Sequence, residues 1–99
     1  MTPENGFELP ESVNFENLVR VRAQGEALID EQDASVFNLN ALQEHTSAAI
    51  ALLIAWFRYS HLQGKSILFV NVPVELRNII ELAELDDLLP LEGDGKNSS

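Results

Sequence analysis

A pair of hydroxyl side chains, Thr46 and Ser47, follows His45 and stands directly before ten consecutive apolar residues, Ala48 to Phe57. A serine close to a histidine is the pairing that nucleophilic catalysis uses. That chemistry also needs a third group to orient the imidazole and donors for an oxyanion. The sequence lacks the G-x-S-x-G elbow that presents a catalytic serine in many hydrolases. We therefore interpret His45 as a loop residue, assign no catalytic residue and expect no enzyme activity.

The sequence predicts neither a metal site nor a cofactor site. The chain contains no cysteine, and Glu44, His45 and His61 do not stand at the spacing of known metal ligands. A glycine-rich loop that could bind the phosphates of a nucleotide is also missing from the sequence. We expect that the protein works without a cofactor.

The two hydroxyls stand where a helix begins. Thr46 or Ser47 is well placed as the N-cap, because a side-chain oxygen there accepts a hydrogen bond from a free amide of the first turn. The same helix end carries partial positive charge, which would favour a phosphate group on Ser47. A cap is thus one role for the pair, and a phosphorylation switch at Ser47 is the other.

The helix expected at 46–63 is apolar on two sides. One stripe, expected to lie on a sheet, consists of Ile50, Leu53, Ile54 and Phe57. The second stripe must meet a neighbouring helix of the same chain, meet a partner, or stay exposed to water. If it meets a partner, it would be a docking surface rich in aromatic residues. The predicted partner-binding residues are Thr46, Ser47, Ala48, Leu52, Trp56 and Tyr59. An uncovered apolar stripe would also favour a homodimer.

Strand and helix patterns alternate around this helix. Strands are expected at 7–13, 35–42 and 66–73, and further helices at 15–31 and 74–85. Asn14 is the expected N-cap of the first helix, Gly25 is expected to allow a close backbone approach, and Gly64 is expected to end the second helix. The uncharged strand at 66–73 is expected to be buried on both faces. This order predicts a small α/β sandwich with a mainly parallel sheet of about three to five strands and about three helices.

Length and charge limit the classes of partner. Ninety-nine residues suggest one domain, placed at 7–91 between flexible ends at 1–6 and 92–99. The formal net charge of −10 disfavours nucleic acid and anionic lipid surfaces as ligands. The apolar run is about half of the roughly 20 residues that span a membrane, and no secretory signal is visible. We expect a cytoplasmic protein without membrane insertion.

The stretch "VFNLNALQEHTSAAIALL" (36–53) resembles the STAS domain, the fold named from sulfate transporters and anti-sigma factor antagonists. In that family an apolar strand and an Asp-Leu-Ser-like segment precede an acidic residue, a Ser or Thr and two small residues, which open an apolar helix. Ser47 falls on the Ser/Thr position, and Thr46 replaces the acidic residue. Asn38 and Asn40 fall on the Asp and the Ser of the segment. The later stretch 64–91 is also similar to the family, so the resemblance covers about residues 7 to 91.

The chain is most similar to the short bacterial MlaB-like type of the Mla phospholipid-transport system. This resemblance implies a cytoplasmic subunit that binds the ATPase of an ABC transporter through the helix bearing Ser47, and so attaches peripherally to the inner membrane. The alternative implied function is an anti-sigma factor antagonist, in which an anti-sigma factor kinase phosphorylates the residue at the position of Ser47. The acid-to-Thr46 replacement favours the transporter subunit over the switch.

Overall fold

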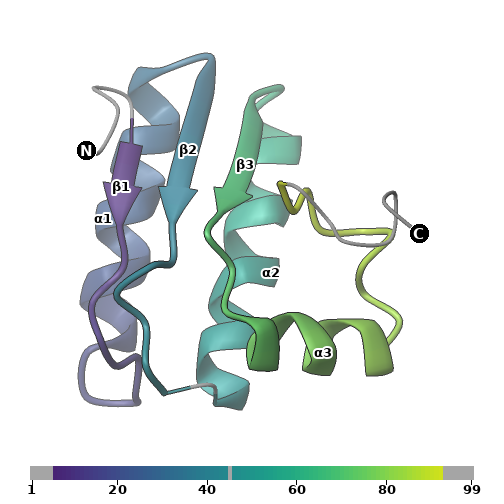
Figure 1. Ribbon diagram of the computed structural model, residues 1–99. Helices are drawn as coiled ribbons and strands as arrows, with labels where there is room; N and C mark the ends of the chain where they lie inside the picture. The colour runs from purple at the N-terminus through teal and green to yellow at the C-terminus, as the bar shows by residue number, and fades with distance from the viewer. Residues whose placement is uncertain (1–5, 45, 93–99) are drawn as a thin grey trace.

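Strands and helices alternate strictly along the chain in the computed structural model, which describes residues 6–44 and 46–92 (Figure 1). The elements are β1 (Gly6–Glu8), α1 (Leu18–Glu31), β2 (Ala34–Asn38), α2 (Ser47–Leu62), β3 (Ser66–Val70) and α3 (Val74–Leu82). The predicted α/β class and its three helices are therefore confirmed. Most of the flexible ends predicted at 1–6 and 92–99 lie outside the described residues.

The sheet is three-stranded and parallel, in the order β1-β2-β3. Its register aligns Phe7 with Phe37 and Phe37 with Phe69, so these aromatic side chains share one face. The connections through α1 and α2 return to that face, and both helices lie behind the strands in Figure 1. The core is thus a layer between three strands and two helices.

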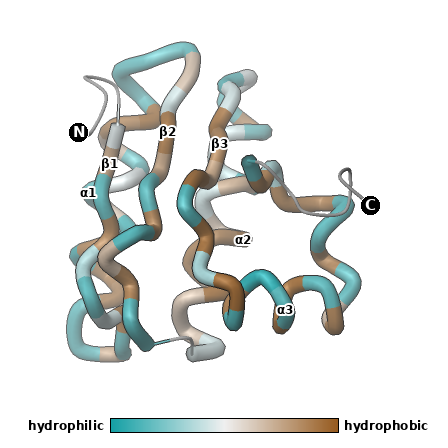
Figure 2. Tube along the Cα trace, viewed as in Figure 1, coloured by the Kyte–Doolittle hydropathy of each residue, from teal (hydrophilic) through white to brown (hydrophobic). Residues whose placement is uncertain are grey.

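The prediction that the strand at 66–73 is buried on both faces is wrong. Ile67 and Phe69 are buried, but Ser66 is exposed and Leu68 keeps 36% of its surface accessible. The reason lies in the topology: α1 and α2 cover the same face, and no described helix lies over the other. Figure 2 shows hydrophobic residues recurring along the strands and α2, whereas the loop between α1 and β2 is hydrophilic.

Trp56 of α2 lies at the centre of this layer and is fully buried. Its ring centroid lies 4.5 Å from that of Phe37 and 5.7 Å from that of Phe7. The indole also lies directly against the backbone of α1 at Gly25, where a Cβ atom would stand only 2.3 Å from Trp56 Cε2. The indole nitrogen donates a hydrogen bond of 3.1 Å to the carbonyl of Arg22. The predicted close approach at Gly25 is confirmed, and Trp56 is its partner.

Local signals set most helix ends. Asn14 does not cap the α-helix itself: its side-chain oxygen accepts hydrogen bonds from the amides of Glu16 and Asn17, in a turn that precedes α1 at Leu18. Gly64 ends α2 as predicted. It has a positive φ of 70°, and the amide of the next residue bonds back to the carbonyl of Ser60 at 2.8 Å. This pattern satisfies the last carbonyls of the helix.

Helix α3 is shorter than the predicted 74–85. It ends at Leu82, two residues before Glu84 adopts a positive φ of 61°. Leu76 and Ile80 are its buried residues, so it packs through a narrow stripe. The segment after it returns to the sheet and bridges Phe69 through Leu91, and Arg77 donates a hydrogen bond to the carbonyl of Glu92.

Replacement of Gly25 by Ala should destabilise the fold by about 1–3 kcal/mol, because the added methyl group overlaps the buried indole ring. In an exposed helix the same change would stabilise by about 1 kcal/mol. Urea unfolding followed by the fluorescence of the single tryptophan measures the difference. The exposed neighbour Gln24→Ala is the control and should stay within about 0.5 kcal/mol of wild type. Equal or greater stability of Gly25→Ala would contradict the packing.

Candidate functional site

The start of α2 lies at the edge of the sheet where all three strands end. Because the strands are parallel, the loops that follow β1, β2 and β3 meet at this edge, which is the lower edge in Figure 1. Ligands of open parallel sheets usually bind at this edge. The predicted hydroxyl pair is therefore placed among three loops that are distant in the sequence.

Thr46 is the N-cap of α2. It has extended backbone angles, and its Oγ1 accepts a hydrogen bond of 3.3 Å from the amide of Ala49. The same hydroxyl donates to the carbonyl of Val13 at 3.3 Å. Thr46 thus supports the first turn of α2 and also ties it to the loop before α1. The question of which hydroxyl forms the cap is resolved in favour of Thr46.

Ser47 is the first residue of α2 and its side chain is exposed. Among the described residues, no hydrogen bond engages its hydroxyl. The first turn contains no acidic side chain, so the positive end of the helix dipole is not neutralised within the turn. This hydroxyl is available to solvent or to a partner. His45 lies outside the described residues.

An asparagine pair fixes the neighbouring loops. The side-chain oxygen of Asn38 accepts hydrogen bonds from the amide of Asn40 at 2.9 Å and from Nδ2 of Asn71 at 3.1 Å. Asn71 has a positive φ of 56°, a conformation that asparagine tolerates better than most residues. The contact joins the loops after β2 and β3. Sequence reasoning singled out Asn38 and Asn40 but missed Asn71, which fell inside the strand predicted at 66–73, whereas β3 ends at Val70.

A second tie crosses the loop before α2. Ser12 donates a hydrogen bond of 2.7 Å from its hydroxyl to the carboxylate of Glu44. The amides of Gln43 and Glu44 also bond to the carbonyl of Glu11. Together with the contact between Thr46 and Val13, these bonds hold the start of α2 against the loop after β1. Nothing in the sequence pattern indicated the partnership of Ser12 and Glu44.

The predicted docking face was placed on the wrong side of α2. Leu52 and Trp56 keep only 1% and 0% of their surface accessible, and Ala48 is also buried. Of the stripe expected to lie on the sheet, Leu53 is fully buried, whereas Ile50, Ile54 and Phe57 are only half-buried. The physical reason is the bare backbone at Gly25, which lets α1 close over the indole and seal this side. Leu52 and Trp56 therefore belong to the core of the folded chain.

Tyr59 lies at the edge of the contact between α1 and α2 and is half-buried. Its hydroxyl donates a hydrogen bond of 2.7 Å to the carboxylate of Asp30 on α1. This bond raises the pKa of the Tyr59 phenol, and partial desolvation and the charges of Asp30 and Glu26 act in the same direction. Tyr59 is thus engaged in holding α1 to α2, although part of its ring is still accessible.

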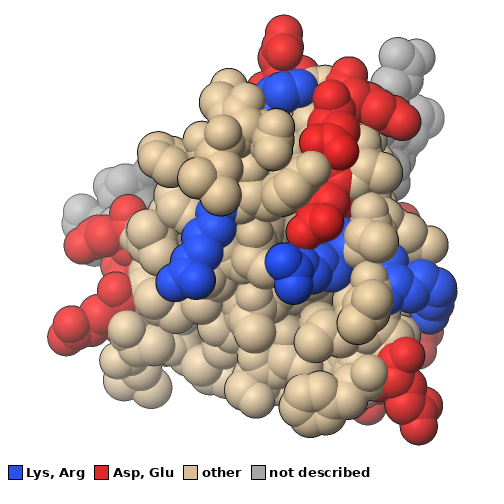
Figure 3. Space-filling model, turned by 180° about the vertical axis from the view of Figure 1, so that it is seen from behind, with Lys and Arg blue, Asp and Glu red and all other residues tan. Residues whose placement is uncertain are grey.

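The outward side of α2 is a different stripe, formed by Ser47, Ala51, Ala55, Arg58 and Leu62. Of these, Ala55 is half-buried and the others are exposed. Helix α2 contains no Asp or Glu, although the chain has a net charge of −10. From the helix side, Figure 3 shows uncharged residues over much of the face, with Lys or Arg side chains among them and a column of acidic residues that runs from the upper edge towards the middle. The start of α2 and its outward stripe contribute no acidic side chain to this face.

Residues 6–44 and 46–92 contain no group of three His, Asp or Glu side chains that could hold a metal ion. Within the same ranges, every helix is too short or too polar to cross a membrane.

Comparison with known proteins identifies the fold. No family model matches the chain, and no curated protein matches its sequence. Similar solved structures exist, and three of them are described here. A Thermotoga maritima protein described as an anti-sigma factor antagonist aligns with a TM-score of 0.75 at 11% identity, over 99% of this chain and 88% of its own. A Planctomyces limnophilus anti-sigma-factor antagonist (STAS) domain protein gives 0.72 at 11% identity, over 87% of this chain and 79% of its own.

The third structure is the anti-sigma factor antagonist SpoIIAA in its unphosphorylated form. It aligns with a TM-score of 0.69 at 13% identity, over 93% of this chain and 82% of its own. All three likenesses cover most of both chains at very low identity. They show that the chain has the fold of these antagonist domains.

The cap assignment predicts different effects for the two hydroxyls. Thr46→Ala should lower the free energy of unfolding by about 1 kcal/mol, because the hydrogen bonds from the Thr46 hydroxyl to the amide of Ala49 and to the carbonyl of Val13 are both lost. Thr46→Ser, which keeps the oxygen, should recover most of this loss. Ser47→Ala should stay within about 0.5 kcal/mol of wild type. Urea unfolding measures all three variants, and an equal loss for Ser47→Ala and Thr46→Ala would contradict the assignment.

Proposed function

We propose that the protein is a non-catalytic regulatory module that binds a larger protein through the start of α2. The observation that carries this proposal is the exposed hydroxyl of Ser47, which forms no hydrogen bond with the described residues and lies at the positive end of a helix. It stands at the sheet edge where the strands end, and side-chain hydrogen bonds hold the loops of this edge in place. This edge presents a defined shape, because its loops are tied to each other before any partner binds. The contact centres on Ser47 and extends along the outward stripe of α2.

The likeness to antagonist domains supports a regulatory role. The three similar structures are described as anti-sigma factor antagonists, and one of them is named by its unphosphorylated form. The resemblance between 36–53 and the STAS pattern places Ser47 at the position that carries the Ser or Thr of that family. Fold and sequence pattern thus support the same place on the molecule.

The first partner that we propose is the cytoplasmic ATPase of a lipid-transporting ABC complex of the Mla type. The resemblance of the sequence pattern to MlaB-like subunits supports it, and such docking needs no phosphate on Ser47. The outward stripe of α2 fits this role, because most of its side chains are small or apolar and are easily desolvated in a stable subunit contact. In this role the protein would reside at the inner membrane through its partner.

The second partner that we propose is an anti-sigma factor with kinase activity. The exposure of Ser47 favours it, since a kinase must reach the hydroxyl oxygen that takes the phosphoryl group from ATP. Thr46 replaces an acidic residue of the family pattern, yet it still caps the helix, so the geometry around Ser47 does not depend on that acid. A phosphate there would add about two negative charges at a helix end that favours anions, and would alter the contact with the partner.

The docking role predicts that Ser47→Glu weakens partner binding about tenfold or more, because a larger charged side chain enters the contact. The binding partner is whichever protein the neighbouring genes encode, a transporter ATPase or an anti-sigma factor, purified and titrated calorimetrically. Ser66→Glu is the matched control: Ser66 is exposed and lies at the opposite edge of the sheet, where β3 begins. If Ser47→Glu and Ser66→Glu both bind like wild type, the start of α2 is not the contact.

The two partner classes differ in a second experiment. Incubation with the cognate kinase and ATP should add one phosphate to wild type and none to Ser47→Ala, as read by intact-protein mass. This result would assign the protein to the anti-sigma system. A chain that stays unmodified while it binds the transporter ATPase would assign it to the ABC complex and overturn the switch.

A further inference from the structure

A groove runs between α1 and α2 on the side of the helices that faces away from the sheet. It has a volume of about 360 Å³ and is lined mainly by apolar side chains. Its lining residues from α1 span Leu18 to Glu26, which is about 12 Å at 1.5 Å per residue. The groove therefore has the length of about two helical turns.

The floor of the groove is made of small side chains. Ala51 and Ala55 stand one turn apart on α2, and Ala23 faces them from α1. Val19 forms part of the rim and keeps 78% of its surface accessible. Small residues at the bottom and an aliphatic rim permit the close approach of another helix, which is a common mode of peptide recognition.

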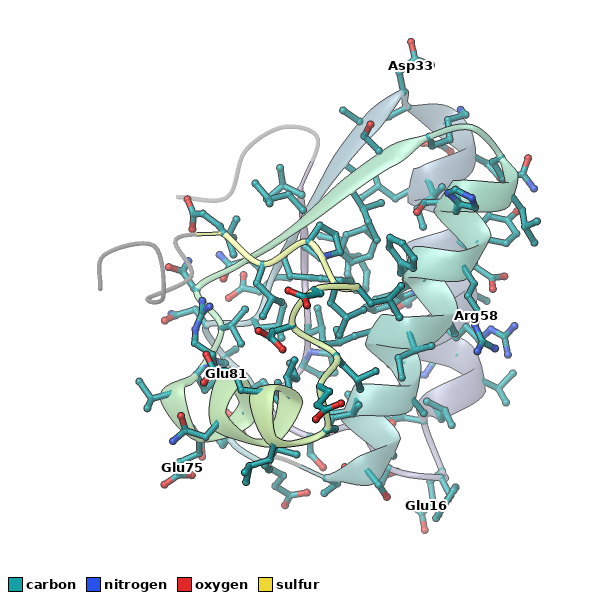
Figure 4. The ribbon with its side chains drawn as sticks, turned by 90° about the vertical axis from the view of Figure 1, so that its right-hand side faces the viewer. Glu16, Asp33, Arg58, Glu75 and Glu81 are labelled. Carbon is teal, nitrogen blue, oxygen red and sulfur yellow. The ribbon has the colours of Figure 1, made fainter. Side chains whose placement is uncertain are left out.

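One cation, Arg58, lies beyond Ala55 on the outward stripe of α2, next to the groove but not in its lining. Glu26 at the groove is already paired with Arg22 at 2.9 Å. Arg58 is exposed, points away from the sheet in Figure 4, and forms no ion pair with the described residues. Because α2 has no acidic residue of its own, this face offers an unpaired cation in a chain whose net charge is −10.

We propose that the groove between α1 and α2 binds an amphipathic, acidic helix of a partner protein. The apolar side of that helix would lie on Ala51 and Ala55, and one of its carboxylates would pair with Arg58. The proposal rests on the docking role proposed above and specifies the element that the partner contributes. The groove begins one turn beyond Ser47, so a single partner could contact both.

The test uses the full-length, isotopically labelled chain and synthetic peptides of about 18 residues, long enough to form amphipathic helices. One peptide carries a Leu/Ala face and Glu on its polar face. A second has Lys in place of Glu, and a third has the first composition in scrambled order. We expect amide shifts at Ala23, Ala51 and Ala55 with the acidic peptide, and about tenfold weaker binding of the other two.

Two variants in and beside the groove, with one control variant outside it, locate the contact. Ala51→Glu should abolish the shifts because it fills the floor with a carboxylate, whereas Ala83→Glu, an exposed alanine after α3, should not affect them. Arg58→Glu should reverse the preference towards the Lys peptide. Absence of shifts in the groove, equal binding of all three peptides, or indifference to Ala51→Glu would overturn the proposal.

Other occupants give different results. If Ala51→Glu disrupts a dimer of the free chain in analytical ultracentrifugation, the groove is occupied by a second copy and the proposal fails. Shifts at the same amides on addition of phosphatidylcholine vesicles, with none from the peptides, would assign the groove to lipid.

Ser47→Ala should bind the acidic peptide normally. If the wild-type chain does not bind this peptide although its binding to the partner protein depends on Ser47, the groove proposal fails and the docking role stands. Partner binding that is independent of Ser47 overturns the docking role alone.

Discussion

The packing of the Trp56 indole against the bare backbone of α1 at Gly25 governs the arrangement of the helices. A glycine in the middle of a helix is unfavourable by about 1 kcal/mol relative to alanine, yet here it lets a large aromatic ring reach the carbonyl of Arg22 and the ring of Phe37. Because α1 lies so close, it seals the side of α2 that carries Leu52. The indole thus joins the two helices to the sheet.

This packing also decides what α2 shows to solvent. With Trp56 turned inward, the opposite side presents Ser47, two alanines and Arg58, a surface with small side chains and no carboxylate. The parallel topology then places the first residue of α2 at the sheet edge where the loops meet, and the cap at Thr46 holds it there. The feature that stabilises the core and the feature that could bind a partner are therefore opposite sides of one helix.

Much of this could be predicted from the sequence, and the failures have a common cause. Local signals predicted the order of elements, the close approach at Gly25, the helix end at Gly64 and a cap at Thr46 or Ser47. The rotation of α2 was not predictable in the same way, because its apolar residues surround the helix and the pattern does not rank one side above another.

The same limit applies to β3. An uncharged strand indicates burial, but only the path of both crossovers shows that one face has no helix. The tie between Asn38 and Asn71 joins loops far apart in the sequence, so no local pattern reveals it.

Hydrogen–deuterium exchange of the chain with and without its purified partner tests the central claim most directly. The first amides of a helix lack intrahelical acceptors, so those of Ser47 and Ala48, which precede the capped amide of Ala49, should exchange readily in the free chain. Docking on this end should slow exchange there and leave the peptide that contains Trp56 unchanged, because its amides are already buried or bonded in the core. Protection confined to the uncovered face of the sheet or to α3, with the start of α2 unchanged, would contradict the account.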